Sequence, residues 1–179
     1  ELIGAALCNA EDDIILVSKL GMSLKFQAND EQLRPMGRQT AGVQGMKFRE
    51  GDELLAMDVV WGDSDKDLFV VTNEGFAKRT AISEYRLQGR NGFGVKAVQL
   101  AEGRGSLVGA VIVEENDQIM AIMKSGKVIR SNVDEVKRTG RTTQGVTFAK
   151  PDKNDEIISI ARNEEKDDDE SAENATVNE

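Results

Sequence analysis

Histidine is absent from the 179 residues, and cysteine occurs once, at position 8. Histidine is the commonest general base and metal ligand in proteins, and zinc sites combine several cysteine and histidine side chains. Their scarcity excludes histidine-dependent hydrolase triads and zinc modules. A single cysteine also excludes an intramolecular disulfide, which fits a reducing compartment. Cys8 lies in an apolar segment, so we expect a buried structural thiol there.

Long apolar runs are also missing. The apolar stretches are strand-sized and fall far short of the ~20 residues that a membrane-spanning helix needs, so we expect a soluble protein without a membrane partner. No signal peptide or targeting segment is recognisable, which favours a cytoplasmic location. The chain starts at Glu1, directly before an apolar run at residues 2–8, and we expect it to be cut from a longer protein.

The net charge of −9 is distributed unevenly along the chain. Residues 164–179 hold eight acidic residues and one basic residue, so they account for −7 of this charge and leave −2 for residues 1–163. A nearly neutral body can carry a basic edge if its acids gather elsewhere, so the overall charge does not exclude nucleic acid. Residues 163–179 have dense like charge and no apolar periodicity, and we predict a disordered acidic tail.

A sequence pattern occurs three times. The motif Gly-Arg-x-x-x-Gly-Val begins at Gly37, Gly89 and Gly140, at steps of 52 and 51 residues. Each copy follows an apolar run, a glycine turn and a base four residues after that glycine, and a further apolar strand opens each unit. We predict repeats at residues 2–53, 54–106 and 107–156, followed by a closing strand at 157–161 that completes a blade.

The repeats predict an all-β fold. Their strands are short and separated by glycine turns, and the one helical feature expected in each unit is a single turn ending at Leu33, Tyr85 or Val136. About fifty residues suit a four-stranded blade, and such blades stack radially in propeller-like folds. A usual ring has about four to eight blades, so we predict that residues 1–162 form a partial ring.

Basic residues recur at equivalent positions of the repeats, and acidic residues recur in the turn after each opening strand. Radial stacking would place the bases in a belt around one perimeter, opposite an acidic rim. Such a belt suits the phosphates of duplex DNA. Base reading is not expected, because no recognition helix is evident. The candidate DNA-binding residues are Lys25, Arg34, Arg38, Lys78, Arg79, Arg86, Arg90, Arg130, Lys137, Arg138 and Arg141.

Other interpretations of the same pattern remain open. The repeated Gly-Arg is also explained by turn chemistry, with glycine providing a positive φ and arginine being solvated or paired with a carboxylate. A basic belt could equally bind acidic proteins, so a propeller-like protein-interaction scaffold is the alternative function. No clustered acid–base pair or metal-ligand set is recognisable, so we expect neither catalytic nor metal-binding residues.

The repeats resemble the C-terminal DNA-wrapping domain of the bacterial DNA gyrase A subunit over roughly residues 1–162. Residues 33–46 (LRPMGRQTAGVQGM) and 75–85 (GFAKRTAISEY) are similar to actinobacterial members of this family. The resemblance implies a β-pinwheel of related blades. In the family, a heptad with the sequence Gln-Arg-Arg-Gly-Gly-Lys-Gly is needed to close the DNA wrap. Residues 88–94 resemble a degenerate second copy of this box that retains Gln88, Arg90, Gly92 and Gly94, whereas Asn91 and Phe93 replace a glycine and the lysine.

This resemblance implies non-sequence-specific binding, bending and wrapping of duplex DNA within the gyrase A polypeptide. The parent enzyme is then an ATP-dependent type II topoisomerase, with two A and two B subunits, that introduces negative supercoils into the nucleoid. The family's catalytic tyrosine lies in another domain and its ATPase in the gyrase B polypeptide, so the resemblance implies no cofactor here, with ATP and Mg bound elsewhere. The similar domain of topoisomerase IV remains an alternative. The acidic tail would provide solubility or compete with DNA for the basic belt, as acidic tails do in some gyrases.

Overall fold

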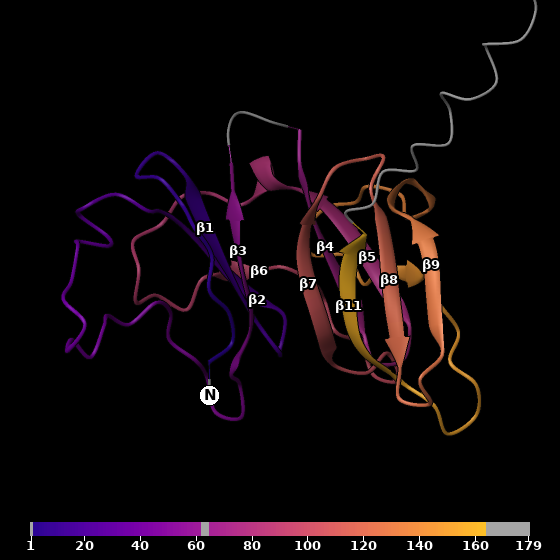
Figure 1. The fold of residues 1–179 in the computed structure, drawn as a ribbon. Coiled ribbons are helices and arrows are strands. Elements are labelled where there is room, and N and C mark those ends of the chain that lie inside the picture. Colours follow the sequence, from indigo (N-terminus) through magenta and orange to yellow (C-terminus); the bar gives the residue numbers. More distant parts are fainter. Residues whose placement is uncertain (1, 62–64, 164–179) are drawn as a thin grey trace, which may run out of the picture.

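The computed structural model describes residues 2–61 and 65–163, and its regular structure consists mainly of strands (Figure 1). The strands are β1 (Asp13–Ser18), β2 (Met22–Gln27), β3 (Leu54–Val60), β4 (Asp67–Thr72), β5 (Phe76–Ala81), β6 (Val95–Lys96), β7 (Leu107–Val113), β8 (Gln118–Met123), β9 (Val128–Asn132), β10 (Val146–Thr147) and β11 (Ile157–Asn163). Two short 3₁₀ turns, η1 (Ile82–Glu84) and η2 (Val133–Glu135), are the only helical elements among the described residues. The all-β prediction is confirmed.

Three antiparallel sheets form the blades, with strand orders β3-β1-β2-β6, β10-β5-β4-β7 and β11-β8-β9. The hairpin of one repeat supplies two strands of each sheet, and the next repeat supplies the others. β7 contacts both β3 and β11 (Figure 1). We call the side of these three strands the inner side, and the side of β6 and β10 the outer perimeter. Because strands are exchanged between repeats, each sheet is offset by one strand from the repeat as counted in the sequence.

The strand predicted at residues 2–8 is not formed. Residues 2–9 have no regular structure, and Leu2 and Leu7 are exposed. The equivalent strands β3, β7 and β11 each pair with the first strand of the preceding hairpin, and no hairpin precedes residue 2 in the 179 residues. Cys8 is exposed as well, so the expectation of a buried thiol was wrong for the same reason.

The middle sheet is buried on both faces, because an apolar core lies between it and each neighbouring sheet. Side chains alternate along a strand, so Leu68 and Val70 of β4 pack toward the first sheet while Phe69 and Val71 pack toward the third. Every residue of β4 is buried. Full burial of such an apolar side chain stabilises the fold by about 1.5–3 kcal/mol, so the middle sheet holds its two neighbours together.

The single helical turn predicted in each repeat forms in the second and third repeats, as η1 and η2. The residues that follow these turns, Tyr85 and Val136, are buried in the two cores. In the first repeat, Leu33 N donates to Asn29 O at 2.7 Å without forming a helix.

The three sheets do not close a ring, and the third has no outer strand among the described residues. Asn163, the first residue of the predicted tail, instead ends β11, and the rest of that prediction, residues 164–179, lies outside the described part.

Candidate nucleic-acid interface

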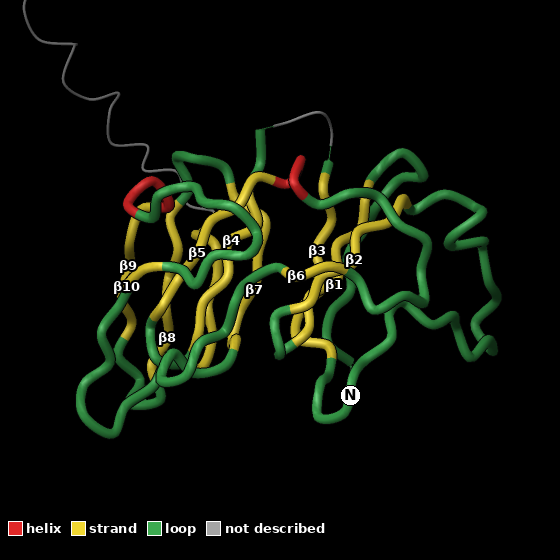
Figure 2. The backbone as a smooth tube through the Cα atoms, turned by 180° about the vertical axis from the view of Figure 1, so that it is seen from behind, coloured by secondary structure: helices red, strands yellow, loops and turns green. Residues whose placement is uncertain are grey.

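The outer perimeter of the first two sheets is covered by a segment of the following repeat. After η1, residues 85–96 cross to the first sheet and end in β6, which pairs with β2; residues 136–147 cross to the second sheet in the same way and end in β10, which pairs with β5 (Figure 2). Gln88 N donates to Lys25 O and Thr139 N donates to Arg79 O, both at 2.8 Å. The second and third copies of the Gly-Arg motif therefore lie on the perimeter of the preceding sheet.

The second glycine of the motif is required by this close approach. Gly94 and Gly145 have φ values of 72° and 81°, in the left-handed region. A Cβ atom would lie 2.1 Å from Ser23 O at Gly94 and 2.5 Å from Ala77 O at Gly145, so no side chain fits. The turn interpretation assigned the positive φ to the glycine of Gly-Arg, and this was wrong, because the first glycine of each copy has no positive φ and the second glycine has one.

The motif arginine connects one repeat to the previous one. Arg90 Nη1 donates to Gln44 O at 2.7 Å, and Arg141 Nη1 donates to Lys96 O at 3.1 Å. The two acceptors occupy equivalent positions, two residues after the second glycine of their own motif. The same contact therefore recurs at successive repeats, and it arranges the three motif copies as a continuous series. Arg38, in the first copy, is exposed.

The backbone of the same arginines is held by the turn of the previous repeat. Arg90 N donates to Gln32 Oε1 at 3.0 Å, and Arg141 N donates to Glu84 Oε2 at 3.1 Å. Gln32 and Glu84 again occupy equivalent positions of their repeats. The motif is therefore fixed through both its side chain and its backbone, so the residues around it have defined places on the perimeter.

The loop that resembles a degenerate box packs against the first motif. Lys47 N donates to Gly92 O at 2.7 Å, and Asn91 N donates to Gly45 O at 2.6 Å. Asn91 has a φ of 63°, a conformation in which asparagine is tolerated better than most residues. This conformation explains how asparagine replaces a glycine there. Phe93 is exposed, with the Arg49 guanidinium carbon 5.9 Å from its ring centroid.

The candidate bases separate into two sets that the sequence did not distinguish. The strand bases are Lys25 on β2, Arg79 on β5 and Arg130 on β9, and the perimeter bases are Arg34, Arg86 and Lys137. Each perimeter base follows the residue that ends the turn. All three perimeter bases are exposed, and they have no acidic partner among the described residues.

The strand bases are directed to partners within their own sheets. Lys25 Nζ lies 3.4 Å from Asp13 Oδ2, and Arg79 Nε lies 3.4 Å from Asp67 Oδ2; both bases are buried. Arg130 Nε donates to Gln118 Oε1 twelve residues earlier, the same spacing as in the other two pairs. Arg130 is exposed, and no strand in the described part of the chain covers the outer side of β9. The expectation that Lys25 and Arg79 face a ligand is therefore corrected.

Charged side chains gather around Asp67 and Arg79, the two buried members of this cluster. Arg138 Nε lies 2.9 Å from Asp67 Oδ1, Arg138 Nη1 lies 3.0 Å from Asp65 Oδ1, and Arg79 Nη2 lies 3.8 Å from Glu115 Oε1. Burial raises the pKa of Asp67 above its usual range, against the opposing effect of Arg138 and Arg79. Pairing with Asp65 and Asp67 raises the pKa of Arg138. The acidic turns therefore pair with some of the bases, instead of forming a separate rim opposite them.

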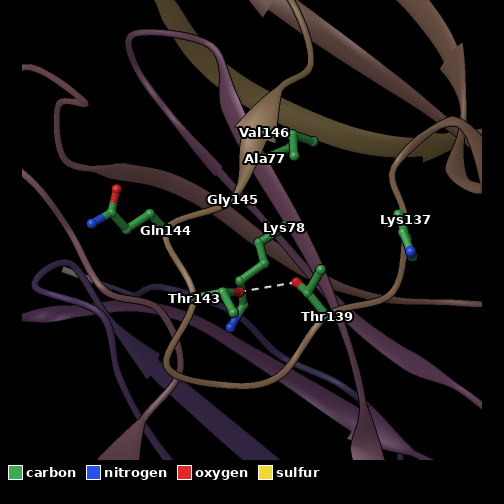
Figure 3. A pocket seen from close by; sticks show the side chains of 8 residues that line it. All are labelled: Ala77, Lys78, Lys137, Thr139, Thr143, Gln144, Gly145 and Val146. Carbon is green, nitrogen blue, oxygen red and sulfur yellow. Dashed lines mark hydrogen bonds between the residues drawn. The ribbon is translucent and has the colours of Figure 1, made fainter.

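Lys78 is buried as well, although it was expected to contact DNA. Its Nζ donates to Ala97 O at 2.5 Å, Gly140 O at 2.9 Å and Arg141 O at 2.6 Å. Burial lowers the pKa of the Lys78 ammonium to about 8. Figure 3 shows this side chain beneath the loop that carries Thr139 and Thr143. Because an ammonium has three N–H donors, none remains for a phosphate, and Lys78 is removed from the interface.

Two further bases contribute to the perimeter and were missed in the sequence. Lys96 on β6 is exposed, but the equivalent residues Gln44 and Thr147 are neutral, so no repeating signal marked it. Arg104 donates through Nη1 to Gly145 O at 2.9 Å, and its guanidinium carbon lies 4.5 Å from the ring centroid of Phe76. Arg104 thereby contacts the second glycine of the third motif, whereas Lys78 contacts its first two residues.

The chemistry that the perimeter offers is cationic. Arginine and lysine side chains on hydrogen-bonded backbone segments are suited to binding a polyanion. Among residues 2–61 and 65–163, no three histidine, cysteine, aspartate or glutamate side chains gather into a group that could hold a metal ion. The described part of the chain has no helix that is both long and apolar enough to cross a membrane.

Comparison with known protein families matches the chain three times. The family is described as the DNA gyrase C-terminal domain, beta-propeller, and the matches cover residues 12–60, 66–114 and 117–164. Each match contains one hairpin and the inner strand that pairs with it. The family unit therefore follows the hairpin and inner strand of each sheet, whereas the outer strands β6 and β10 fall in the match that follows their own sheet's match.

Related sequences lead to the same family. The DNA gyrase A protein of Streptomyces coelicolor is 55% identical over 165 residues, which cover 92% of this chain and 19% of that protein. The DNA gyrase A protein of Mycolicibacterium smegmatis is 50% identical over 167 residues, which cover 93% of this chain and 20% of that protein. The chain thus spans about a fifth of the length of these curated relatives. The predicted similarity to actinobacterial gyrase A sequences is confirmed.

Solved structures show the fold. A gyrase A C-terminal domain superposes with a TM-score of 0.77 at 29% identity, covering 85% of this chain and 50% of that one. The C-terminal domain of DNA topoisomerase IV superposes with a TM-score of 0.78 at 21% identity, covering 86% of this chain and 47% of that one. At this identity, the similarity shows the fold alone. From its strand-exchanged blades, its repeated motif and these matches, we conclude that the chain belongs to the DNA gyrase C-terminal domain family.

Proposed function

We propose that this chain binds duplex DNA along its outer perimeter, without sequence preference, and bends the duplex around its blades. The observation that carries this proposal is the exposure of the perimeter bases Arg34, Arg86 and Lys137 in all three repeats, without an acidic partner among the described residues. Bases on successive sheets, at equivalent positions, suit a ligand whose charges also repeat. Duplex DNA carries such charges, and its phosphates are contacted independently of sequence.

Anchoring of the motif supports the same proposal. In the second and third repeats, the residue before each perimeter base is buried in a core, as Tyr85 and Val136 show, and the motif after it is hydrogen-bonded to the previous repeat. The bases are therefore carried on backbone that does not have to be ordered when DNA binds. Bending a duplex site of 20–30 bp by 40–90° costs on the order of 1–6 kcal/mol. Phosphate contacts from several blades would offset this cost.

In the larger protein, the wrapped duplex would support supercoiling. We propose that the chain acts within the gyrase A polypeptide, in an A₂B₂ type II topoisomerase that introduces negative supercoils with ATP. This chain would supply DNA binding, while the residues that cut DNA and the sites for ATP and Mg would lie elsewhere in the assembly. Such an enzyme would work in the cytoplasm, on the nucleoid. The degenerate box at residues 88–94 would place the perimeter through the bond of Arg90 to Gln44 O. Guanidinium N–H groups of Arg90 that this bond does not use would be available to a phosphate.

A salt titration of DNA binding tests the proposal. Replacing Arg86 and Lys137 with glutamate in the full chain should weaken the mobility shift of a duplex and reduce its dependence on salt, by about 0.9 in log–log slope for each phosphate that is no longer bound. The matched control is the double variant Lys150→Glu and Lys153→Glu, which makes the same charge change at two exposed bases in the loop between β10 and β11. We expect this control to bind almost as well as the unmodified chain.

The opposite outcome would favour the protein-interaction alternative. If the unmodified chain gives no mobility shift at low salt, the perimeter is not a DNA surface. If it shifts DNA but the Arg86 and Lys137 variant and the Lys150 and Lys153 control bind equally well, net charge accounts for the binding and the perimeter does not. A shift that depends strongly on base sequence would also contradict the proposed mode of binding.

A further inference from the structure

The two outer segments are held on their sheets in different ways. Beneath the second motif lies Leu24 of β2, whose side chain comes within 3.4 Å of a Cβ position built at Gly92 and within 3.2 Å of one built at Gly94. The first junction is therefore an apolar contact between a leucine and a glycine-rich backbone. The equivalent residue beneath the third motif is Lys78 of β5, next to the strand base Arg79.

The Lys78 ammonium joins three parts of the chain. Its side chain is 1% exposed, and its Nζ donates to one carbonyl of residue 97, which follows β6, and to the carbonyls of Gly140 and Arg141 in the third motif. A buried charge is tolerated only when it is well hydrogen-bonded, and here all three donors are used. The charged groups that act on it are Glu84, which favours the ammonium, and Arg141, which opposes it.

The sequence of the third motif explains why this junction needs a long polar side chain. Thr143 stands where the second motif has Gly92, so this backbone cannot pack as closely on the strand. The Thr143 hydroxyl lies 3.0 Å from the Thr139 hydroxyl, and a recess of about 90 Å³ remains below the loop (Figure 3). The lysine reaches past this recess to carbonyls that a leucine could not contact.

We infer that Lys78 is a positioning residue of the perimeter, which holds the third motif so that Lys137 and Arg141 are presented to DNA at fixed places. This inference rests on the proposed function. Lys78 would contribute to DNA binding without touching DNA. Replacing Lys78 should therefore weaken DNA contacts that other residues make. A residue that contacts a phosphate directly, or one that only fills the core, would not have this effect.

The test is a comparison of salt dependences in the full chain. The double variant Lys137→Met and Arg141→Met should lower the log–log slope of DNA binding by about 1.8, for two phosphate contacts. Lys78→Met should lower the slope by a similar amount, and combining all three changes should give little further decrease, because residues that act through one another are not additive. Leu24→Met, at the equivalent position of the first junction, is the matched control and should leave the slope unchanged.

Two results would overturn the inference. One is a Lys78→Met variant that folds and keeps the slope of the unmodified chain; the other is a decrease in slope that adds fully to that of the double variant. If the unmodified chain itself does not bind DNA, the proposed function fails first, so the two failures are distinguishable.

Amide hydrogen exchange of the unmodified chain provides a test that does not depend on how the variant folds. Arg141 N donates to Glu84, and Thr139 N donates to Arg79 O. If Lys78 holds the third motif, these amides should be protected before DNA is added, and DNA should change their exchange less than threefold. Exchange at the rate of a free loop without DNA would show that the segment is not held, and it would overturn the inference.

Discussion

The strand bases and the perimeter bases carry the same charge and repeat with the same period, but they differ in what covers them. Lys25 and Arg79 lie under an outer segment from the next repeat and pair with Asp13 and Asp67. Of the perimeter bases, Arg86 and Lys137 belong to these covering segments, and all three are exposed. A repeated base is therefore not in itself a ligand contact. In this fold, the strand exchange between repeats decides which set serves the core and which set can bind DNA.

The largest effect should follow from removing a covered strand base. Arg79→Met leaves Asp67 buried with one arginine partner fewer, and the loss of one partner from a buried pair costs about 3–5 kcal/mol. Because Arg138 still pairs with Asp67, we expect a decrease near the lower end, about 3 kcal/mol, in the free energy of unfolding from urea denaturation. Arg86→Met at the perimeter should change it by less than about 0.5 kcal/mol. Equal decreases for the two variants would remove the distinction between the two sets.

A buried base should also be visible in the pH dependence of stability. The folded-state pKa of Lys78 is lowered to about 8 from its ordinary value of 10.5, so between these values the unfolded chain binds more protons than the folded chain. This residue therefore makes the free energy of unfolding rise as the pH increases from about 8 to 10.5, by up to about 3 kcal/mol. The Lys78→Met variant should lack this component of the curve. A variant curve with the same slope in this range would show that the ammonium is not held in a buried site.

The perimeter bases should show the opposite behaviour, with a large effect on binding and little on folding. Replacing Arg34, Arg86 and Lys137 together with glutamine should lower the salt slope of DNA binding by about 2.7, since each phosphate contact contributes about 0.9. The unfolding midpoint in urea should hardly move. A triple variant that unfolds earlier but binds DNA with the original slope would reverse the roles assigned to the two sets.

Arg130 offers an intermediate case, because it is a strand base without an outer strand over it. Arg130→Gln should cost about 0–1 kcal/mol of unfolding free energy, as expected for an exposed polar contact, and thus much less than Arg79→Met. Urea denaturation of both variants in one buffer checks the ranking. A cost as large as that at Arg79 would mean that covering by the next repeat is not what separates the buried bases.

The smallest effect is expected from the acidic end of the chain. Removing residues 164–179 takes away eight acidic residues and one basic residue. If these charges compete with DNA for the perimeter bases, the shortened chain should bind DNA a few-fold more tightly at low salt and equally well at high salt. Affinity that is unchanged at low salt would leave solubility as the role of these residues.

The repeats made most of the fold predictable. Apolar runs located β1, β3, β4, β7, β8 and β11, whereas the short outer strands β6 and β10 were not predicted. The motif marked the close approaches at Gly94 and Gly145. Strand exchange was not predictable, because the pattern of one repeat does not show which hairpin its opening strand will join. That is why residues 2–8 were expected to form a strand and Cys8 to be buried.

The burial of individual bases was only partly predictable. Lys78 occupies a position that is apolar in the other repeats, as Leu24 and Ile129, and this register was a usable signal that its side chain points inward. No such signal existed for Arg138, whose equivalent Leu87 is exposed. Its ion pairs with Asp65 and Asp67 depend on two repeats meeting at the perimeter. Contacts of this kind come from the arrangement of the sheets rather than from the pattern within one repeat.

The central claim is that bases on successive blades form one DNA-binding perimeter, and DNA topology tests it most directly. Nicked circles would be ligated in the presence of the full chain or of its Arg34, Arg86 and Lys137 glutamine variant, and the linking number would be read on a gel. We predict that the unmodified chain shifts the linking number and that the variant, though folded, does not. An identical shift by both proteins would contradict the claim.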